Sequence, residues 1–298
     1  MPLKPERLPD AYRQMLIIRK FEEAIRGMYQ QGKIRGSFHP CVGQEATAVG
    51  GCWPLRQDDA MSCTYRGHGH ALEKGLNPRA AMAEMLGKAT GCCKGKGGSM
   101  HVADFSKGIL GANGIVAGGP PISVGAALAA RIRGNTNVAV SFSGDGSVNQ
   151  GTCFEAMTMA VVLQAPAIFV IENNYYSEHT NISYAVGCDD LKARTEAFGF
   201  PVFVADGSDF FAVYEAAGKA IAHARAGHGP AGVFAEPAAA AAYAGFASYR
   251  RQGLRPDDSD NVVLLTGSGL KDTGSLRQMI KMPESVTPDV DNLEKAVR

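Results

Sequence analysis

Apolar residues near the start of the chain recur every three or four positions, as they do on one face of a helix. This spacing continues from Leu16 to Met28, and Gly32 follows as a helix-ending residue. The pattern predicts an amphipathic helix over residues 10–31. A second helix is predicted to begin at Gln44, after a short loop.

Beyond this region, short apolar runs alternate with helical patterns. The apolar runs, which we predict to be strands, are residues 138–143, 167–171 and 202–205. The helical patterns cover residues 78–88, 122–133, 191–198 and 209–226. Strands that alternate with helices predict an α/β fold, a doubly wound parallel sheet with helices on both faces. Residues 62–75 and the Gly-rich residues 91–119 are predicted to be irregular, and such long segments are usually functional.

Polar residues follow two of the predicted strands. Gly144-Asp145-Gly146 comes directly after one strand, and Asn173-Asn174 comes after the next. Parallel strands end on one rim of a sheet, where ligands bind, so a carboxylate and an amide oxygen can grip one cation there. Octahedral Mg²⁺ takes such oxygens together with substrate phosphates. The glycines let a diphosphate approach the backbone, and the following helix offers its N-terminus. A generic strand-to-helix turn is the alternative, which the paired asparagines disfavour.

Charge and composition narrow the class of protein. The chain has 298 residues, enough for one or two domains, and its 30 Lys and Arg residues balance 29 acidic residues. That balance predicts neither a nucleic-acid partner nor a membrane partner. The first residues are charged and form no apolar signal core, and Gly and Pro break the longest apolar stretch, residues 115–130. We therefore expect a cytoplasmic protein.

Cysteine usage agrees with that location. The seven cysteines are an odd number and show no CxxC spacing, which predicts reduced intracellular thiols. The adjacent Cys92 and Cys93 are interpreted as incidental rather than as a metal site.

Six motifs occur in the order known from one enzyme family: GQEA, TYRGHGHALEKG, GKATGCCKGKGGSMHVAD, GANGIVAGG, GDGSVNQGTCFEAM and ENNYY. On these motifs, residues 10–229 resemble the alpha subunit of the decarboxylating component of 2-oxo-acid dehydrogenase complexes, including the acetoin branch. The resemblance implies a thiamine-diphosphate-binding domain over residues 1–229, with Mg²⁺ and with a beta subunit in an α₂β₂ assembly. It also implies an oxidoreductase that cleaves acetoin or decarboxylates a 2-oxo acid such as pyruvate. The acyl group would pass to a lipoyl-bearing acyltransferase.

The same resemblance assigns roles to individual residues. It implies that Mg²⁺ is bound by the side chains of Asp145 and Asn174 and by the backbone carbonyl of Tyr176. The residues implied to surround the diphosphate are Tyr65, Arg66, Gly144, Gly146 and Ser147. The residues implied to contact the aminopyrimidine are Gly114 and Val116. The histidines implied to lie near the reacting thiazolium, and hence catalytic, are His68, His70 and His101. For each histidine, a surface or hydrogen-bonded loop position is the alternative.

Two features leave the function open. The residues that follow Tyr176, beginning with Ser177, are polar where many pyruvate enzymes carry a small and then an apolar residue. This difference slightly favours acetoin over pyruvate. In addition, no histidine follows His228, so the family's Gly-His-Ser loop, which helps to order the diphosphate, has no counterpart. The alternative is therefore a catalytically impaired subunit that still binds thiamine diphosphate.

Residues 230–298 do not continue this family and form an atypical C-terminal segment. On VFAEPAAAAAYAG and VVLLTGSGLKD they resemble the C-terminal end of threonine synthase and related pyridoxal-phosphate enzymes. The Schiff-base lysine of those enzymes has no match, so Thr266 and Lys271 are expected to have no cofactor role. The chain thus resembles a fusion of two partial enzymes, with a divergent native C-terminus as the alternative. Here we expect strands at residues 233–235 and 262–265 and a helix at residues 238–249.

Overall fold

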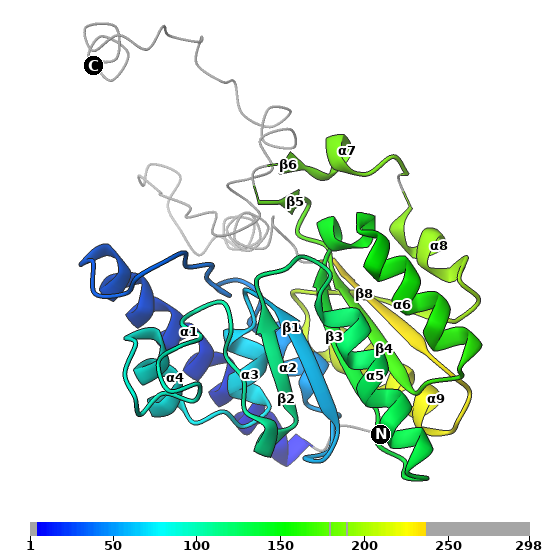
Figure 1. Ribbon diagram of the computed structural model, residues 1–298, viewed down its shortest axis with the longest axis horizontal. Helices are drawn as coiled ribbons and strands as arrows, with labels where there is room; N and C mark the ends of the chain where they lie inside the picture. The colour runs from blue at the N-terminus through cyan, green and yellow to red at the C-terminus, as the bar shows by residue number, and fades with distance from the viewer. Residues whose placement is uncertain (1–4, 179, 189, 237–298) are drawn as a thin grey trace, which may run out of the picture.

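The computed structural model describes residues 5–178, 180–188 and 190–236. A six-stranded sheet forms its centre, with the strands in the order β2-β1-β3-β4-β8-β7 (Figure 1). These strands are β1 (Ala60–Thr64), β2 (Ile109–Asn113), β3 (Ala139–Gly144), β4 (Ala167–Glu172), β7 (Val202–Asp206) and β8 (Ala231–Glu236). Neighbouring strands are parallel throughout, as predicted. A small antiparallel pair, β5 (Tyr176–Ser177) and β6 (Thr180–Asn181), follows β4.

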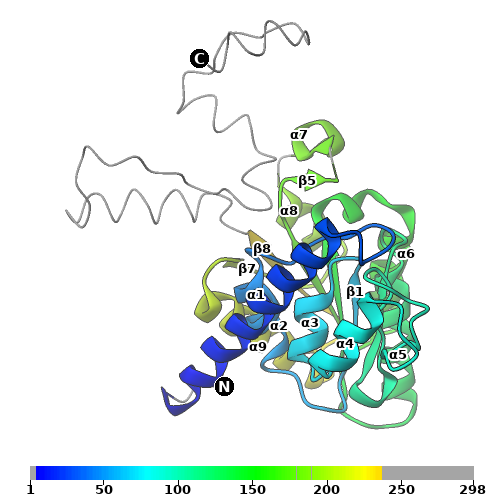
Figure 2. The same ribbon diagram turned by 90° about the vertical axis from the view of Figure 1, so that its left-hand side faces the viewer.

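Helices cover both faces of this sheet. The α-helices are α1 (Leu8–Gln30), α2 (Glu45–Cys52), α3 (His68–Glu73), α4 (Pro78–Met85), α5 (Gly119–Ile132), α6 (Gly151–Val162), α7 (Ile182–Ala185), α8 (Leu191–Glu196) and α9 (Phe210–Arg225). Three short 3-10 helices are η1 (Pro5–Arg7), η2 (Phe105–Lys107) and η3 (Asp145–Asn149). Figure 2 shows α1, α2 and α9 on one side of the sheet and α5 and α6 on the other. The doubly wound α/β fold is therefore confirmed.

The buried residues form two cores, one on each face of the sheet. Strand β4 divides its side chains between them, with Ile168 and Val170 in one core and Phe169 and Ile171 in the other. This division follows from the strand geometry, in which successive side chains point to opposite faces. A parallel strand that is covered on both faces must be apolar at every position, which explains the continuous apolar run. Among the described helices, none is both long and apolar enough to span a bilayer. The cytoplasmic location stays a prediction.

The long predicted helices and the apolar strands are confirmed, with ends shifted by a few residues. Polar side chains cap the starts of several helices; for example, Asn77 Oδ1 accepts from the Arg79 N–H (2.8 Å) and Asp209 Oδ1 from the Phe211 N–H (2.8 Å). The prediction of irregular structure was wrong for two segments. Residues 62–75 contain part of β1 and all of α3, and residues 91–119 contain β2.

The missed strands lack an apolar pattern because small and polar residues occupy their positions. Ser62 of β1 is buried, and its hydroxyl donates to the Gly119 carbonyl (3.0 Å) and lies 2.8 Å from the Ser123 hydroxyl. These contacts tie β1 to the start of α5, which packs closely on the strand. The polar Ser62 side chain can therefore be buried because its hydroxyl is hydrogen-bonded.

The strand predicted at residues 233–235 is confirmed as part of β8. It lies between β4 and β7, with Val233 opposite both Val170 and Phe203. The sheet therefore continues past residue 229, while the division into residues 1–229 and 230–298 stays a prediction. The predicted helix at residues 238–249, the predicted strand at residues 262–265, Thr266 and Lys271 all lie outside the described residues.

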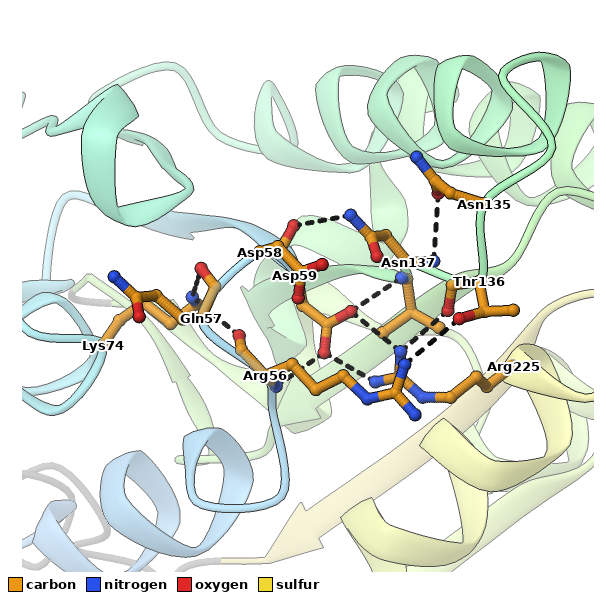
Figure 3. Close-up of polar contacts among 10 residues, drawn as sticks. Arg56, Gln57, Asp58, Asp59, Lys74, Asn135, Thr136, Asn137 and Arg225 are labelled. Carbon is orange, nitrogen blue, oxygen red and sulfur yellow. Dashed lines mark hydrogen bonds and ion pairs between the residues drawn. The ribbon is translucent and has the colours of Figure 1, made fainter.

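A cluster of polar residues lies at the end of the sheet where strands β1 and β3 begin (Figure 3). Asp59, directly before β1, accepts hydrogen bonds from the backbone N–H groups of Arg56 (2.7 Å) and Val138 (2.9 Å). Its carboxylate also pairs with Arg225 at the end of α9, whose guanidinium in addition donates to the Thr136 carbonyl (2.7 Å). One buried carboxylate thus joins the loops before β1 and β3 to helix α9.

Candidate functional site

A cleft opens at the carboxyl ends of the strands. Its walls come from the segments that follow β1, β2, β3 and β4, the position at which open parallel sheets bind ligands. The predicted site residues that line it are Tyr65, Arg66, Val116, Gly144, Gly146, Ser147, Asn174 and Tyr176. Segments up to about a hundred residues apart in sequence are thus brought to one place by the parallel strands.

The residues predicted to bind a cation are in direct contact. Strand β3 ends beside β4, so that Gly144 lies opposite Glu172. The Asp145 carboxylate is only 1% exposed, and its Oδ1 accepts a hydrogen bond from the Asn174 N–H (3.2 Å). Asn174 Oδ1 in turn accepts from the Tyr176 N–H (3.2 Å). A carboxylate, a side-chain amide and a backbone carbonyl are hard oxygen donors, so this set fits Mg²⁺.

The turn after β3 differs from the expected helix start. Residues Asp145–Asn149 form η3, and α6 begins only at Gly151, so the helix that directly follows Gly144 is a single 3-10 segment. The Ser147 hydroxyl donates to the Gly144 carbonyl (2.5 Å) and tightens this turn. Gly146 is required by close packing, because a Cβ there would overlap the side chain of Ser177.

Tyr65 and Arg66 form a second wall of the cleft. One guanidinium N–H of Arg66 donates to the Pro40 carbonyl (2.5 Å), and the guanidinium carbon lies 6.0 Å from the centre of the Tyr65 ring. The His39 ring packs against the Tyr65 ring, with 4.4 Å between the ring centres. A guanidinium fixed in this way suits the oxygens of a phosphate group.

The histidines predicted to be catalytic occupy three different environments. His68, the first residue of α3, is buried between α1 and the loop that carries Ser99: its Nδ1 donates to Glu22 Oε1 (2.8 Å), and its Nε2 lies 2.9 Å from the Ser99 hydroxyl. His70 is also buried, and its Nε2 donates to Glu172 Oε1 (3.0 Å). His70 therefore reaches the cleft through Glu172, which lines it, whereas His68 supports the fold beside it.

His101 is exposed and lies with the predicted residue Gly114. Its Nε2 accepts a hydrogen bond from the Gly114 N–H (3.4 Å), which holds two loops of the Gly-rich segment together. The described residues that line the cleft do not include five of the predicted site residues: His68, His70, His101, Gly114 and Asp145. A catalytic role for the three histidines stays a prediction.

The chain matches a family model over most of its length. Residues 13–233 match the family described as "Dehydrogenase E1 component". The protein belongs to the dehydrogenase E1 family. This assignment confirms the resemblance that the six motifs indicate.

Individual members of the E1 family are similar to the chain. The alpha subunit of an acetoin:2,6-dichlorophenolindophenol oxidoreductase from Cupriavidus necator is 49% identical over 77% of this chain and 69% of its own length. Its counterpart from Bacillus subtilis is 49% identical over 74% and 66%. The alpha subunit of the pyruvate dehydrogenase E1 component from Rhizobium meliloti is 43% identical over 74% and 63%. The chain thus spans about two thirds of the length of these relatives.

A solved structure from Mycobacterium smegmatis, described as a thiamin diphosphate-dependent enzyme, is similar at a TM-score of 0.44. The similarity covers 67% of this chain and 34% of that chain at 17% sequence identity. The fold assignment rests instead on the parallel sheet and on the E1 family match.

Gln44 and Glu172 also line the cleft of this E1 protein, and no role was predicted for either from the sequence. Gln44 is 7% exposed, and its Oε1 has no hydrogen-bond partner among the described residues. Glu172 is 5% exposed and is the last residue of β4. Glu172 could have been found from the sequence as a single charge at the end of a buried apolar strand. Gln44 lies in the motif GQEA, and Glu172 lies in the motif ENNYY.

Proposed function

We propose that the protein is the alpha subunit of a thiamine-diphosphate-dependent dehydrogenase. It cleaves acetoin or decarboxylates a 2-oxo acid such as pyruvate, and it passes the acyl group to a lipoyl-bearing acyltransferase. The observation that carries this proposal is the contact between Asp145 and Asn174 at the cleft, beside Arg66 and the glycines of the β3 turn. A cation and an anionic phosphate group are the ligands that such a set of donors suits.

In this proposal the chain's own residues bind and orient the cofactor. Asp145, Asn174 and the Tyr176 carbonyl hold Mg²⁺, while Arg66 and the turn from Gly144 to Ser147 hold the diphosphate. When bound, thiamine diphosphate supplies the electron sink for cleavage next to a carbonyl group. Asp145 is buried, and its carboxylate would attract a cation more strongly in this surrounding than it would in water.

The floor of the cleft supplies polar groups that position a ligand. The Glu172 carboxylate is held by the buried His70 imidazole at 3.0 Å, so its orientation is set from beneath the cleft. Gln44 presents a buried amide oxygen whose hydrogen-bond partner a bound ligand or its water would provide. Both groups act on a ligand in our proposal, and neither is expected to bind the metal.

A beta subunit is part of the proposal. The loop between β2 and α5 carries Ile115, which is 73% exposed, and Val116, which is 40% exposed, at the mouth of the cleft. Exposed apolar side chains at the edge of a binding site are typical of a surface that a partner covers. The relatives are named as alpha subunits, which supports an α₂β₂ assembly with the cofactor between subunits.

Acetoin is the substrate that we favour. The relatives from Cupriavidus necator and Bacillus subtilis, at 49% identity, are named for acetoin, and the relative named for pyruvate dehydrogenase is 43% identical. After Tyr176 the chain has Ser177 and then the polar Glu178, where many pyruvate enzymes carry a small and then an apolar residue, which slightly favours the acetoin branch. A second candidate, an impaired subunit that binds the cofactor without turnover, is motivated by the absence of any histidine after His228.

Calorimetric titration of the full chain with thiamine diphosphate and Mg²⁺ tests the proposal. We expect saturable binding that requires Mg²⁺ and that disappears in Asp145→Ala. The matched control is Asp104→Ala, which removes a half-buried carboxylate that caps η2 and does not line the cleft. Mg²⁺-independent binding, or equal binding by Asp145→Ala, contradicts the proposal. A different result is that the wild-type chain binds the cofactor while its complex with a beta subunit cleaves neither acetoin nor pyruvate. That result would identify the protein as the second candidate, a subunit that binds the cofactor without turnover.

A further inference from the structure

Two adjacent cysteines, Cys92 and Cys93, lie together on the Gly-rich segment after α4, and neither is among the residues that line the cleft. Cys92 Sγ and Cys93 Sγ are 4.0 Å apart, and both residues are half-buried. Both are free thiols, as are the other five cysteines of the chain. The sequence suggested no function for this pair, whereas the structure turns both sulfur atoms toward one another.

Glu84 of α4 holds this pair in place. Its carboxylate accepts hydrogen bonds from the backbone N–H groups of Cys93 (2.8 Å) and Gly95 (2.9 Å) at one oxygen, and of Gly97 (2.7 Å) and Gly98 (3.1 Å) at the other. Burial by itself raises the pKa of Glu84, but these four bonds outweigh it and lower the pKa. The carboxylate is therefore charged at neutral pH, and it fixes the loop that carries both thiols.

The donor set limits which ligands fit. An oxygen of Glu84 and the two sulfur atoms lie within 4.8 Å of one another, as a metal site would require. Both carboxylate oxygens, however, already accept two N–H bonds each, so the carboxylate is saturated. Zn²⁺ in a structural site needs four protein ligands, and this cluster offers only the two sulfur atoms freely.

We propose that Cys92 and Cys93 form a dithiol site that captures trivalent arsenic compounds. Such a compound, R–As=O, condenses with two thiols to give a cyclic dithioarsenite and one molecule of water. Two As–S bonds form, the As=O bond and two S–H bonds break, and both protons leave with the oxygen. Arsenic stays trivalent, so neither an oxidant nor a reductant is required.

The surroundings favour the pair over every other thiol in the chain. Cys92 and Cys93 are adjacent and both are half-buried, so one arsenical can reach both sulfur atoms. Cys93 Sγ makes only weak hydrogen bonds, to the carbonyls of His101 (3.4 Å) and Ala103 (3.6 Å), which are cheap to break. The other five thiols are less suitable: Cys188 is half-buried but has no cysteine neighbour in sequence, and the rest are buried, namely Cys41, Cys52, Cys63 and Cys153.

Titration of the full chain with phenylarsine oxide, after reduction with a phosphine, tests this site. We expect one arsenical per chain in the intact mass and the loss of two thiols that a thiol reagent can titrate in the native protein. The adduct should be reversed by the dithiol 2,3-dimercaptopropanol and resist an equal concentration of a monothiol. Chelation by two sulfur atoms gives this resistance, because the second bond forms within one molecule.

Three variants complete the test. Cys92→Ser and Cys93→Ser should each weaken capture by about 100-fold, because a single remaining thiol loses the chelate. Cys188→Ser, the matched control, should capture the arsenical as the wild type does. Unchanged capture by Cys93→Ser, no capture by the wild type, or tight equimolar Zn²⁺ binding at this cluster would overturn the proposal. Circular dichroism of each variant checks that the fold is intact.

Discussion

Arg225 and Asp59 form a bidentate ion pair at the amino ends of the strands, the end of the sheet opposite the cleft. Arg225 Nη2 lies 2.6 Å from Asp59 Oδ2, and Nη1 lies 3.1 Å from Oδ1, although the two residues are 166 positions apart in sequence (Figure 3). Asp59 is 0% exposed. A buried carboxylate is stable only when it is paired, so each partner depends on the other.

Arg225→Met is therefore expected to lower the free energy of unfolding by about 3 kcal/mol, because it leaves the Asp59 charge buried without its counterion. Urea denaturation measures this change. Lys219→Met is the matched control on the same helix: Lys219 pairs with Glu215 at 2.7 Å, but both side chains are exposed. That variant should lose less than about 1 kcal/mol. Equal losses in the two variants would contradict the assignment of the Asp59 pair as a stabilising one.

Glu73 predicts a dependence of stability on pH. Burial raises its pKa from 4.5 to about 8, against a smaller opposing effect of Arg7, and its Oε2 has no hydrogen-bond partner among the described residues. In the unfolded chain the carboxyl loses its proton near pH 4.5, whereas the folded chain keeps it up to about pH 8. The folded state is thus progressively disfavoured between these values, and the loss levels off above them.

Glu73→Gln should remove this loss. We expect similar free energies of unfolding for the variant and the wild type at pH 4.5, and a variant more stable by about 1 to 3 kcal/mol at pH 9, since the buried group then carries no charge. Urea denaturation at both pH values gives the comparison. A difference between the two proteins that does not change with pH would show that Glu73 ionises normally in the folded chain.

The contact between Gly146 and Ser177 predicts a pair of coupled substitutions. Gly146→Ala places a Cβ against the Ser177 side chain and should cost about 1 to 3 kcal/mol of stability, with weaker binding of thiamine diphosphate. Gly125→Ala in α5 is the control, because Gly125 is exposed and outside the cleft and a Cβ there would meet no atom within 4 Å. The double variant Gly146→Ala with Ser177→Gly should recover both properties, since it removes the overlap. Additive losses, measured by thermal denaturation and calorimetry, would rule out this contact as the cause.

Gln44 predicts opposite effects on stability and on binding. Gln44→Met replaces a buried amide, whose oxygen has no partner among the described residues, by an apolar side chain of similar length. The free protein should unfold at the same or a higher temperature, because no unsatisfied polar atom remains. Affinity for thiamine diphosphate should fall by about tenfold, the equivalent of one hydrogen bond. A variant that loses stability and keeps its affinity would assign Gln44 to the fold alone.

Local pattern alone was enough to predict much of this protein. The apolar period of α1 and the continuous apolar runs of β3 and β4 are set by residues close in sequence, which must face one core or two. The position of Asp145 and Asn174 at strand ends followed from the same runs, because parallel strands end on one rim. The six motifs predicted the E1 family, which the family match over residues 13–233 confirms.

Other features depended on contacts that no local pattern carries. Strands β1 and β2 hold small and polar residues such as Ser62 and Gly111, and they became strands only because helix α5 and neighbouring strands cover them. The insertion of β8 between β4 and β7 is a choice among sheet orders that its own apolar run does not specify. The pairing of His68 with Glu22 and of Arg225 with Asp59 likewise joins residues from distant segments. Hydrophobic period is a property of neighbours in the chain, whereas the burial of a charge depends on which distant group arrives beside it, and only the folded sheet decides that.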